Sequence, residues 1–149
     1  MAQVAAPQID ASALFPLLKA LSSVDAELRR NSNRRLRQAA ATCARDLVGE
    51  LRSSAAASAT PQAVLVARTA RVKSDRVPLV QIGGTRKVGR RKTPAGRLVW
   101  GSEHGGPTFG AAAGGTYWID PAVKAFNAGP AQGVYLTEVV GILRDAKVL

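Results

Sequence analysis

The spacing of apolar residues predicts a long amphipathic helix over about residues 24–57. Apolar positions recur there at steps of three and four residues or multiples of four, whereas most of the arginines fall off this stripe. Ser23 is expected to cap the helix, with Asp25 and Glu27 in the first turn, where carboxylates suit the helix dipole. The helix would be about 50 Å long, with one face on the core and a basic face in solvent. The stripe consists of Leu28, Leu36, Ala40, Cys43, Leu47 and Leu51.

A shorter helix is predicted before it, from an Asp10 cap to about Leu21, and residues 1–9 are expected to form a flexible arm. Pro16 falls inside this helix and should shorten or bend it. Its apolar side consists of Leu14, Leu17, Leu18 and Leu21.

Three strands are predicted in the middle of the chain. Apolar and polar residues alternate over residues 63–72, and residues 77–82 and 97–101 give two further candidates. Antiparallel pairing of the last two strands would make residues 84–96 a protruding basic loop. Its glycines and like charges favour a loop that is mobile in the free protein.

The last third of the sequence predicts a glycine-rich stretch followed by helix. Residues 101–115 contain too many glycines for regular structure, and residues 117–119 form a compact aromatic segment. Asp120 is expected as a helix cap with Pro121 at the first helical position, and the helix should break at residues 127–130 and resume to about Ala146. The elements together predict an α+β fold, with a long N-terminal helix, a small antiparallel sheet and a C-terminal helix. A single domain over residues 1–149 suits this length.

Positive charge is concentrated in one part of the chain. The net charge is +11, and residues 68–97 hold ten Lys/Arg and one Asp, giving +9, against +3 for residues 1–67 and −1 for residues 98–149. Such a patch attracts phosphates or acidic protein surfaces, although a solvated loop that only keeps the protein soluble is the alternative. Because no aromatic residue lies between Gly83 and Val99, contact with a nucleic-acid backbone is favoured over base stacking. The candidates are Arg86, Lys87, Arg90, Arg91, Lys92 and Arg97.

The sequence gives little support for catalysis. Ser102, Glu103, His104 and Asp120 are the ingredients of a hydrolase triad, but the pattern Gly-x-Ser-x-Gly is absent. Residues 110–115 are rich in glycine but lack the Gly-Lys-Ser/Thr ending of a phosphate-binding loop. With one cysteine and one histidine in the sequence, we expect no disulfide within the chain, no metal site, no cofactor and no enzyme activity.

The location of the protein is also an expectation from the sequence. The N-terminus lacks the pattern of a signal peptide, and no stretch approaches the roughly 20 apolar residues that span a bilayer. We therefore expect the protein to have no membrane partner and to remain in the cytoplasm, unless it leaves inside a larger particle.

Two segments resemble a known family. They are Trp100-Gly-Ser-Glu-His-Gly-Gly106, with Phe109 after it, and Tyr117-Trp-Ile-Asp-Pro-Ala-Val123. These segments, and the order of elements over roughly residues 12–147, resemble the tail-completion (neck) proteins of long-tailed bacteriophages, the gpZ-like head–tail joining proteins. The basic residues 86–92 and the glycine-rich residues 110–115 depart from the family pattern.

The resemblance implies a structural role in the virion, after assembly in the host cytoplasm. Copies of the chain would form or join a ring, usually sixfold, between the head connector and the tail tube, and would keep DNA in the channel. A tail terminator ring is the alternative within this class, and a nucleic-acid-binding protein or a hydrolase built on Ser102 and His104 are the alternatives outside it. Trp100, Tyr117 and Trp118 would be core residues or interface anchors. The turn and interface candidates are Trp100, Glu103, His104, Trp118, Asp120 and Pro121.

Overall fold

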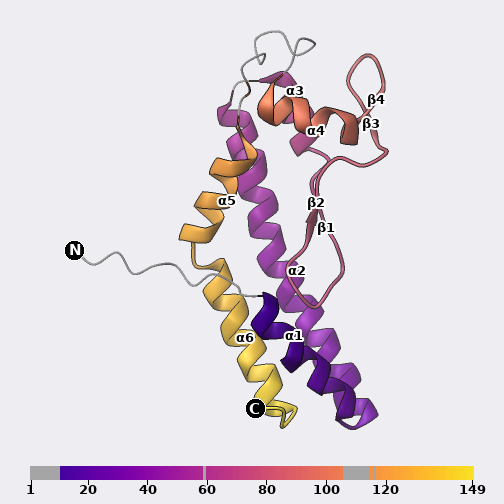
Figure 1. Cartoon of the computed structure of the whole chain (residues 1–149), viewed down its shortest axis with the longest axis vertical. Coiled ribbons are helices and arrows are strands. Elements are labelled where there is room, and N and C mark those ends of the chain that lie inside the picture. Colours follow the sequence, from indigo (N-terminus) through magenta and orange to yellow (C-terminus); the bar gives the residue numbers. More distant parts are fainter. Residues whose placement is uncertain (1–10, 59, 106–114, 116) are drawn as a thin grey trace, which may run out of the picture.

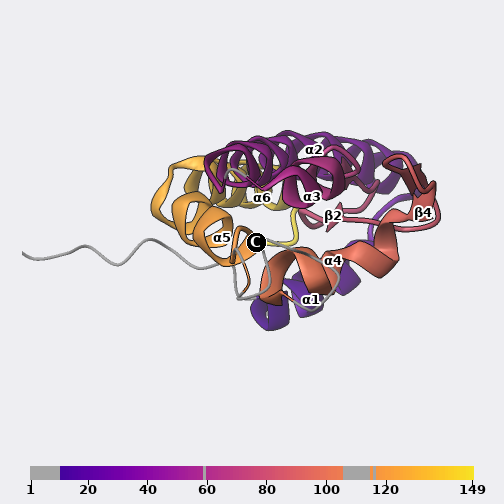
Figure 2. The ribbon, with the colours of Figure 1, turned by 90° about the horizontal axis from the view of Figure 1, so that it is seen from above.

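The long helix is the axis of the molecule. The computed structural model describes residues 11–58, 60–105, 115 and 117–149, so the predicted arm, the Asp10 cap, Phe109 and residues 110–114 lie outside the described residues. Helix α2 (Ala26–Ala57) runs the length of the fold, with α5 (Ile119–Ala128) and α6 (Ala131–Asp145) along one side and strands β1 (Arg71–Val72) and β2 (Val80–Gln81) along the other (Figure 1). Viewed from above, α1 (Ala11–Ala20) and α4 (Ala95–His104) lie on one side of the molecule, in the lower part of the picture, and α2 and α6 lie in a layer on the other side (Figure 2). The predicted α+β fold is confirmed.

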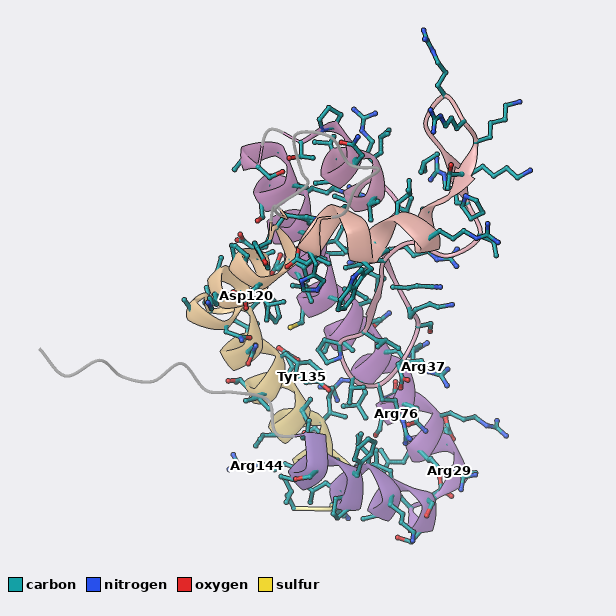
Figure 3. The ribbon with its side chains drawn as sticks, turned by 45° about the horizontal axis from the view of Figure 1, so that its top comes forward. Arg29, Arg37, Arg76, Asp120, Tyr135 and Arg144 are labelled. Carbon is teal, nitrogen blue, oxygen red and sulfur yellow. The ribbon has the colours of Figure 1, made fainter. Side chains whose placement is uncertain are left out.

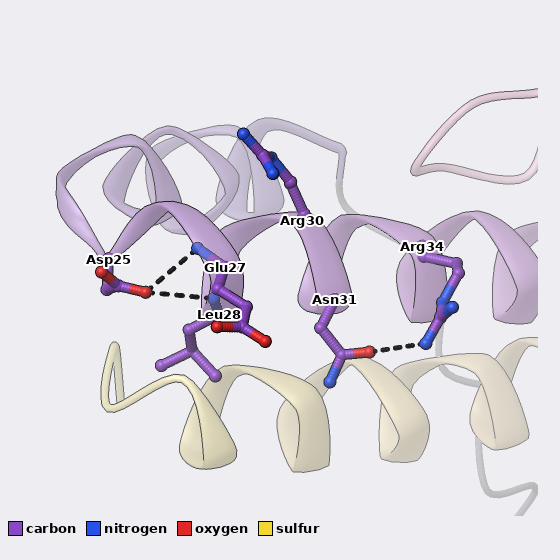
Figure 4. Close-up of a pocket in the computed structure, with 6 residues that line it drawn as sticks. All are labelled: Asp25, Glu27, Leu28, Arg30, Asn31 and Arg34. Atoms are coloured by element: carbon purple, nitrogen blue, oxygen red, sulfur yellow. Dashed lines mark hydrogen bonds between the residues drawn. The ribbon is translucent and has the colours of Figure 1, made fainter.

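The cap of α2 differs from the prediction. The Asp25 carboxylate accepts hydrogen bonds from the backbone N–H groups of Glu27 (3.0 Å) and Leu28 (3.4 Å), as Figure 4 shows. The prediction that Ser23 caps the helix was wrong, because Ser23 ends a 3₁₀ turn (Leu21–Ser23) and its hydroxyl donates to the carbonyl of Ala20. The predicted apolar stripe is confirmed: four of its members are buried, and Leu28 and Leu47 are partly buried against the core.

Helix α2 contributes residues to two apolar clusters. The first joins α1, the N-terminal half of α2 and α6, and includes Leu18, Leu36 and Ile142. The second joins the C-terminal half of α2, α3 (Pro61–Ala67) and the start of α5. Leu47 packs against both clusters. Among the described residues, no helix is both long enough and apolar enough to cross a membrane.

Two of the predicted strands are partly or wholly helical. Residues 63–67, half of the first predicted strand, belong to α3, which has Pro61 at its start and buries Ala63, Val66 and Ala67, a spacing of three and four residues. Of this predicted strand, only residues 71–72 are extended and paired. Residues 97–101 belong to α4. The short alternation of valines in the first segment therefore indicated the two-residue period of a strand, whereas the buried residues follow the period of a helix.

The strands that form are short and build two separate ladders. Strand β1 (Arg71–Val72) pairs antiparallel with β2 (Val80–Gln81), with Arg71 opposite Gln81. Strand β3 (Lys87–Val88) pairs antiparallel with β4 (Thr93–Pro94), with Lys87 opposite Pro94. The pairing predicted between residues 77–82 and 97–101 was therefore wrong. The basic loop forms its own hairpin, which projects from the fold (Figure 1).

The C-terminal helices are close to the prediction. The break at residues 127–130 is confirmed, since α5 ends at Ala128 and α6 runs from Ala131 to Asp145. The end of α6 is tied to α2 by an ion pair between Arg35 and Asp145 (2.7 Å). The predicted cap at Asp120 was wrong, because α5 already begins at Ile119 and Asp120 lies in its first turn.

We expect the fold to lose stability at alkaline pH. Burial raises the pKa of the Cys43 thiol from 9.0 to about 11, helped by Asp46, and burial raises the pKa of Tyr135 from 10.0 to about 12, helped by Cys43 and Asp75. The unfolded chain loses these protons at lower pH than the folded chain. Their contribution to stability is therefore complete below about pH 9 and is lost as pH rises from 9 to 12. Urea unfolding across this range measures the loss.

Tyr135→Phe provides the control for this pH dependence. The variant lacks the hydrogen bond from the Tyr135 hydroxyl to the carbonyl of Arg76 (2.7 Å), so it should be about 1 kcal/mol less stable at pH 7. It should nevertheless lose less stability than the wild type between pH 10 and 12. Parallel pH profiles for the two proteins would contradict the assignment.

Candidate functional site

Glu103 is the residue that joins α4 to α5. Its side chain is buried, and its carboxylate accepts hydrogen bonds from the backbone N–H groups of Ile119 (2.7 Å) and Asp120 (3.3 Å). These N–H groups belong to the first turn of α5, where an intrahelical partner is missing and a negative charge suits the helix dipole. Glu103 therefore caps a helix that begins 16 residues further along the chain. Asp120, the predicted cap, instead pairs with Lys124 (2.8 Å) one turn ahead.

Trp118 lies beneath this contact and is almost completely buried. Its indole N–H donates to the hydroxyl of Ser102 (3.1 Å), which in turn donates to the carbonyl of Val99 (2.8 Å). The carbonyl of Trp118 accepts from the hydroxyl of Ser54 on α2 (2.6 Å). The backbone N–H of Tyr117 donates to the carbonyl of Glu103 (2.9 Å). We call the contacts of Glu103, Ser102, Ser54 and Trp118 the joint; together they fix α2, α4 and α5 to one another.

The opposite face of α4 is exposed and aromatic. Trp100 is 72% exposed, and its ring lies 4.0 Å, between centroids, from the ring of His104. The rings of Tyr117 and His104 are close to perpendicular, with 5.8 Å between their centroids. Arg97, Trp100 and His104 are exposed at positions i, i+3 and i+7 of α4, and so share one face of this helix. We call Trp100, His104 and Tyr117 the aromatic face.

The candidate residues therefore separate into an inner and an outer group. Glu103 and Trp118 are inside the joint, whereas Trp100 and His104 face solvent. Pro121 is exposed in the first turn of α5, next to Asp120. The sequence contained no signal for Ser54, because one serine among several near the end of a helix looks like any other solvated residue.

The basic hairpin is fixed to the start of α4. The N–H of Ala95 donates to the carbonyl of Arg86 (2.8 Å), and the N–H of Gly96 donates to the carbonyl of Gly84 (2.9 Å). Gly83 has a φ of +82°, and a Cβ there would lie 2.8 Å from a methyl of Val99, so only glycine permits this approach. Basic side chains extend outward from the hairpin in Figure 3. Arg86, Lys87, Arg90, Arg91 and Lys92 are all exposed. The mobility of the hairpin stays a prediction.

The ingredients of the predicted triad are used for other contacts. Ser102 is fully buried and bonded to the Trp118 indole, the Glu103 carboxylate faces backbone N–H groups, and the ring of His104 lies against that of Trp100 at a tilt of 45°. Within the described part of the chain, no group of three His, Cys, Asp or Glu residues could hold a metal ion.

An open groove of about 670 Å³ lies at the start of α2, away from these candidates (Figure 4). Asp25 caps the helix there, and the side-chain oxygen of Asn31 accepts from Arg34 (3.0 Å). The carboxylate of Asp25 and the amide oxygen of Asn31 are thus engaged within the helix, and none of the predicted site residues lines this groove.

Comparison with protein-family models, with curated proteins and with solved structures gave no match for this chain. The inference of function therefore depends on the chemistry of the joint, the aromatic face and the hairpin.

Proposed function

We propose that this protein is a structural component of the neck of a long-tailed bacteriophage. Copies of the chain would form or join a ring, with sixfold symmetry the first expectation, between the head connector and the tail tube. Its role would be to allow heads and tails to join and to keep DNA in the channel. It would act as a virion protein without enzyme activity, assembled in the host cytoplasm.

One observation carries the proposal. The two segments that resemble neck proteins, residues 100–106 and 117–123, meet at the joint, where Glu103 and Ser102 from the first bind Ile119 and Trp118 from the second. The resemblance therefore falls on residues that determine how α4 is held against α5. Such a joint suits a protein that works by presenting a fixed surface to its neighbours.

The aromatic face supplies a surface of the right kind. Protein interfaces are enriched in Trp, Tyr and Arg, and a few such residues account for most of the binding energy. Trp100 is the most exposed large apolar residue in the described part of the chain, with His104 against it, Tyr117 against His104, and Arg97 one turn before it. The proposal assigns this face to contacts between neighbouring subunits or with an adjacent ring.

Disruption of the gene in a phage that encodes this chain tests the role. We expect filled heads and tails of normal length that fail to join, with infectivity restored by the wild-type chain supplied in trans. Overlong tails would identify a tail terminator instead. Normal virions without the protein would overturn the neck proposal.

Trp100→Ala tests the surface without disturbing the joint. Because loss of an interface anchor costs about 2 kcal/mol or more, we expect binding to the neighbour to weaken by roughly 30-fold and infectious titre to fall. Phe15→Ala is the matched control, since Phe15 is also exposed (61%) but lies on α1. Equal titres for the two variants would contradict an interface at Trp100.

A further inference from the structure

Nearly all of the net charge belongs to one continuous stretch of the fold. Residues 51–102 contain eleven Lys/Arg and one acid, Asp75, giving +10 of the total +11. The remaining residues hold ten Lys/Arg and nine Asp/Glu, giving +1. The stretch comprises the end of α2, α3, both strand ladders and α4, which lie together at one end and along one side of the molecule (Figure 1).

The cations of this stretch have no acidic partners. Among the described residues the two ion pairs are Arg35–Asp145 and Lys124–Asp120, and neither involves residues 51–102. Concentrated like charge without counter-charge repels itself and attracts polyanions. Ten of the eleven cations are exposed: Arg52, Arg68, Arg71, Lys73, Arg86, Lys87, Arg90, Arg91, Lys92 and Arg97.

The basic surface continues from the strands onto α2. The guanidinium of Arg52 donates to the carbonyl of Ala70 (3.4 Å), immediately before β1. At 100° per residue, exposed Arg30, Arg37 and Arg52 fall within an arc of about 60° on α2, over a length of about 33 Å. In Figure 3, Arg37 and Arg76 lie on the side of the hairpin, whereas Arg144 lies on the opposite side.

Two of the three acids of α2 lie away from this flank, whereas Glu27, in the first turn, lies within about 60° of Arg30. On the same helical spacing, Asp46 and Glu50 lie about 120° or more around the helix from Arg30, Arg37 and Arg52. We define the basic face as the ten exposed cations of residues 51–102 together with Arg30 and Arg37.

We infer that the basic face binds double-stranded DNA through its phosphates, without reading the sequence. Guanidinium and ammonium groups fit phosphate oxygens, and duplex DNA presents a charge about every 1.7 Å along its axis. A uniform polyanion can meet cations that are spread over α2, β1 and the hairpin in any register, whereas an acidic protein would need carboxylates at matching positions. The absence of aromatic residues between Gly83 and Val99 argues against base stacking at the hairpin.

The inference deepens the proposed function, because it identifies the partner of the hairpin, and as a statement about the neck it rests on that proposal. The binding itself is independent of particles and is measured on the purified full chain. Fluorescence anisotropy with a labelled 25-base-pair duplex of arbitrary sequence should give a plot of log affinity against log salt. If the face neutralises about five phosphates, the slope should be about −4.5.

Paired charge reversals test whether the face is continuous. Arg90→Glu with Arg91→Glu removes two cations from the hairpin, and Arg68→Glu with Lys73→Glu removes two from beside β1. Each pair should weaken binding and make the slope shallower by about 2, because about 0.9 is lost per phosphate contact. Lys19→Glu with Arg144→Glu is the matched control: both residues are exposed, the change in net charge is the same, and they lie on α1 and α6. The control should keep the wild-type slope.

Three results would overturn the inference: no salt-dependent binding, the same loss in the control as in the two test variants, or tighter binding of a single strand with quenching of Trp100 fluorescence. The third would indicate base stacking on the aromatic face.

The neck proposal and the DNA-binding proposal can be refuted separately. Duplex binding by a chain that is absent from virions would refute the neck role alone, and a virion ring built from a chain that does not bind DNA would refute the DNA-binding face alone.

Discussion

Trp118→Ala should destabilise the protein by about 3–5 kcal/mol, the usual effect of removing a large aromatic side chain from a core. Trp118 is 1% exposed and packs in the cluster shared by α2, α3 and α5. The substitution also removes the indole N–H that donates to Ser102. Urea unfolding followed by circular dichroism measures the loss. If the wild type has a stability of about 5 kcal/mol, the lower end of the usual range, a loss of this size would leave the variant partly unfolded.

Trp100→Ala is the control for this experiment. Trp100 is the other tryptophan of the chain and is 72% exposed, so its replacement should change the stability by no more than about 0.5 kcal/mol. The two tryptophans stand 18 positions apart in similar sequence surroundings, yet the fold gives them opposite roles. Similar losses from the two substitutions would show that the assignment of inner and outer tryptophan is incorrect.

The long helix could be predicted from the sequence because its signal is long and local. From Leu28 to Leu51 the apolar positions keep the helical spacing, and in the structure four of the six are buried and two are partly buried against the core. The first residue of this helix was harder to predict from the sequence, because Ser23 and Asp25 are both good caps. The 3₁₀ turn that ends at Ser23 determines the outcome, and its presence depends on how Leu21 packs in the core.

The error over residues 63–72 and 97–101 has a physical cause. A run of four to eight apolar residues fits either a buried strand or one face of a short helix, and periodicity does not separate them. Helix α4 also requires contacts that no local pattern contains. Its Ser102 and Glu103 face inward because Trp118 and the start of α5 need a hydrogen-bond acceptor and a cap, and these partners lie 16 residues away in the sequence.

The candidate site was predicted as a set of residues rather than as an arrangement. The charge of the hairpin could be counted directly, since exposed Lys and Arg are the default. The sequence could not show which of Trp100 and Trp118 is buried, because both stand in mixed apolar and glycine-containing segments. The basic flank of α2 was visible as arginines off the apolar stripe. Its continuity with β1 appears only through the contact between Arg52 and Ala70.

The joint connects these separate features. It fixes one face of α4 against α2 and α5, so the opposite face holds the aromatic residues in a defined position. The same helix is anchored at its start to the basic hairpin through Ala95 and Gly96. One short helix thus carries an aromatic surface at its end and a basic surface at its beginning. A change that loosens the joint should therefore disturb both surfaces at once.

Glu103→Lys should cause such a change. The carboxylate is 6% exposed and accepts two backbone hydrogen bonds, and a buried cation in its place would face the positive end of the α5 dipole. We expect a loss of stability of about 3 kcal/mol or more for Glu103→Lys, because one buried charge replaces another of the wrong sign. Glu103→Ala should lose about 2 kcal/mol, as loss of a cap and of two charge-assisted bonds implies. Urea unfolding measures both, and Glu138→Ala on the exposed face of α6 is the control.

Glu103→Gln separates this internal role from a contact across a subunit interface. The amide oxygen still accepts one backbone hydrogen bond, so we expect a loss of only about 1 kcal/mol, with the variant folded at 25 °C. If Glu103 acts only within the joint, particles that carry Glu103→Gln should assemble, whereas Glu103→Lys fails because the chain itself is unstable. A fully stable Glu103→Lys protein would refute the capping role. A stable Glu103→Gln protein that blocks assembly would place the carboxylate in contact with a neighbouring subunit.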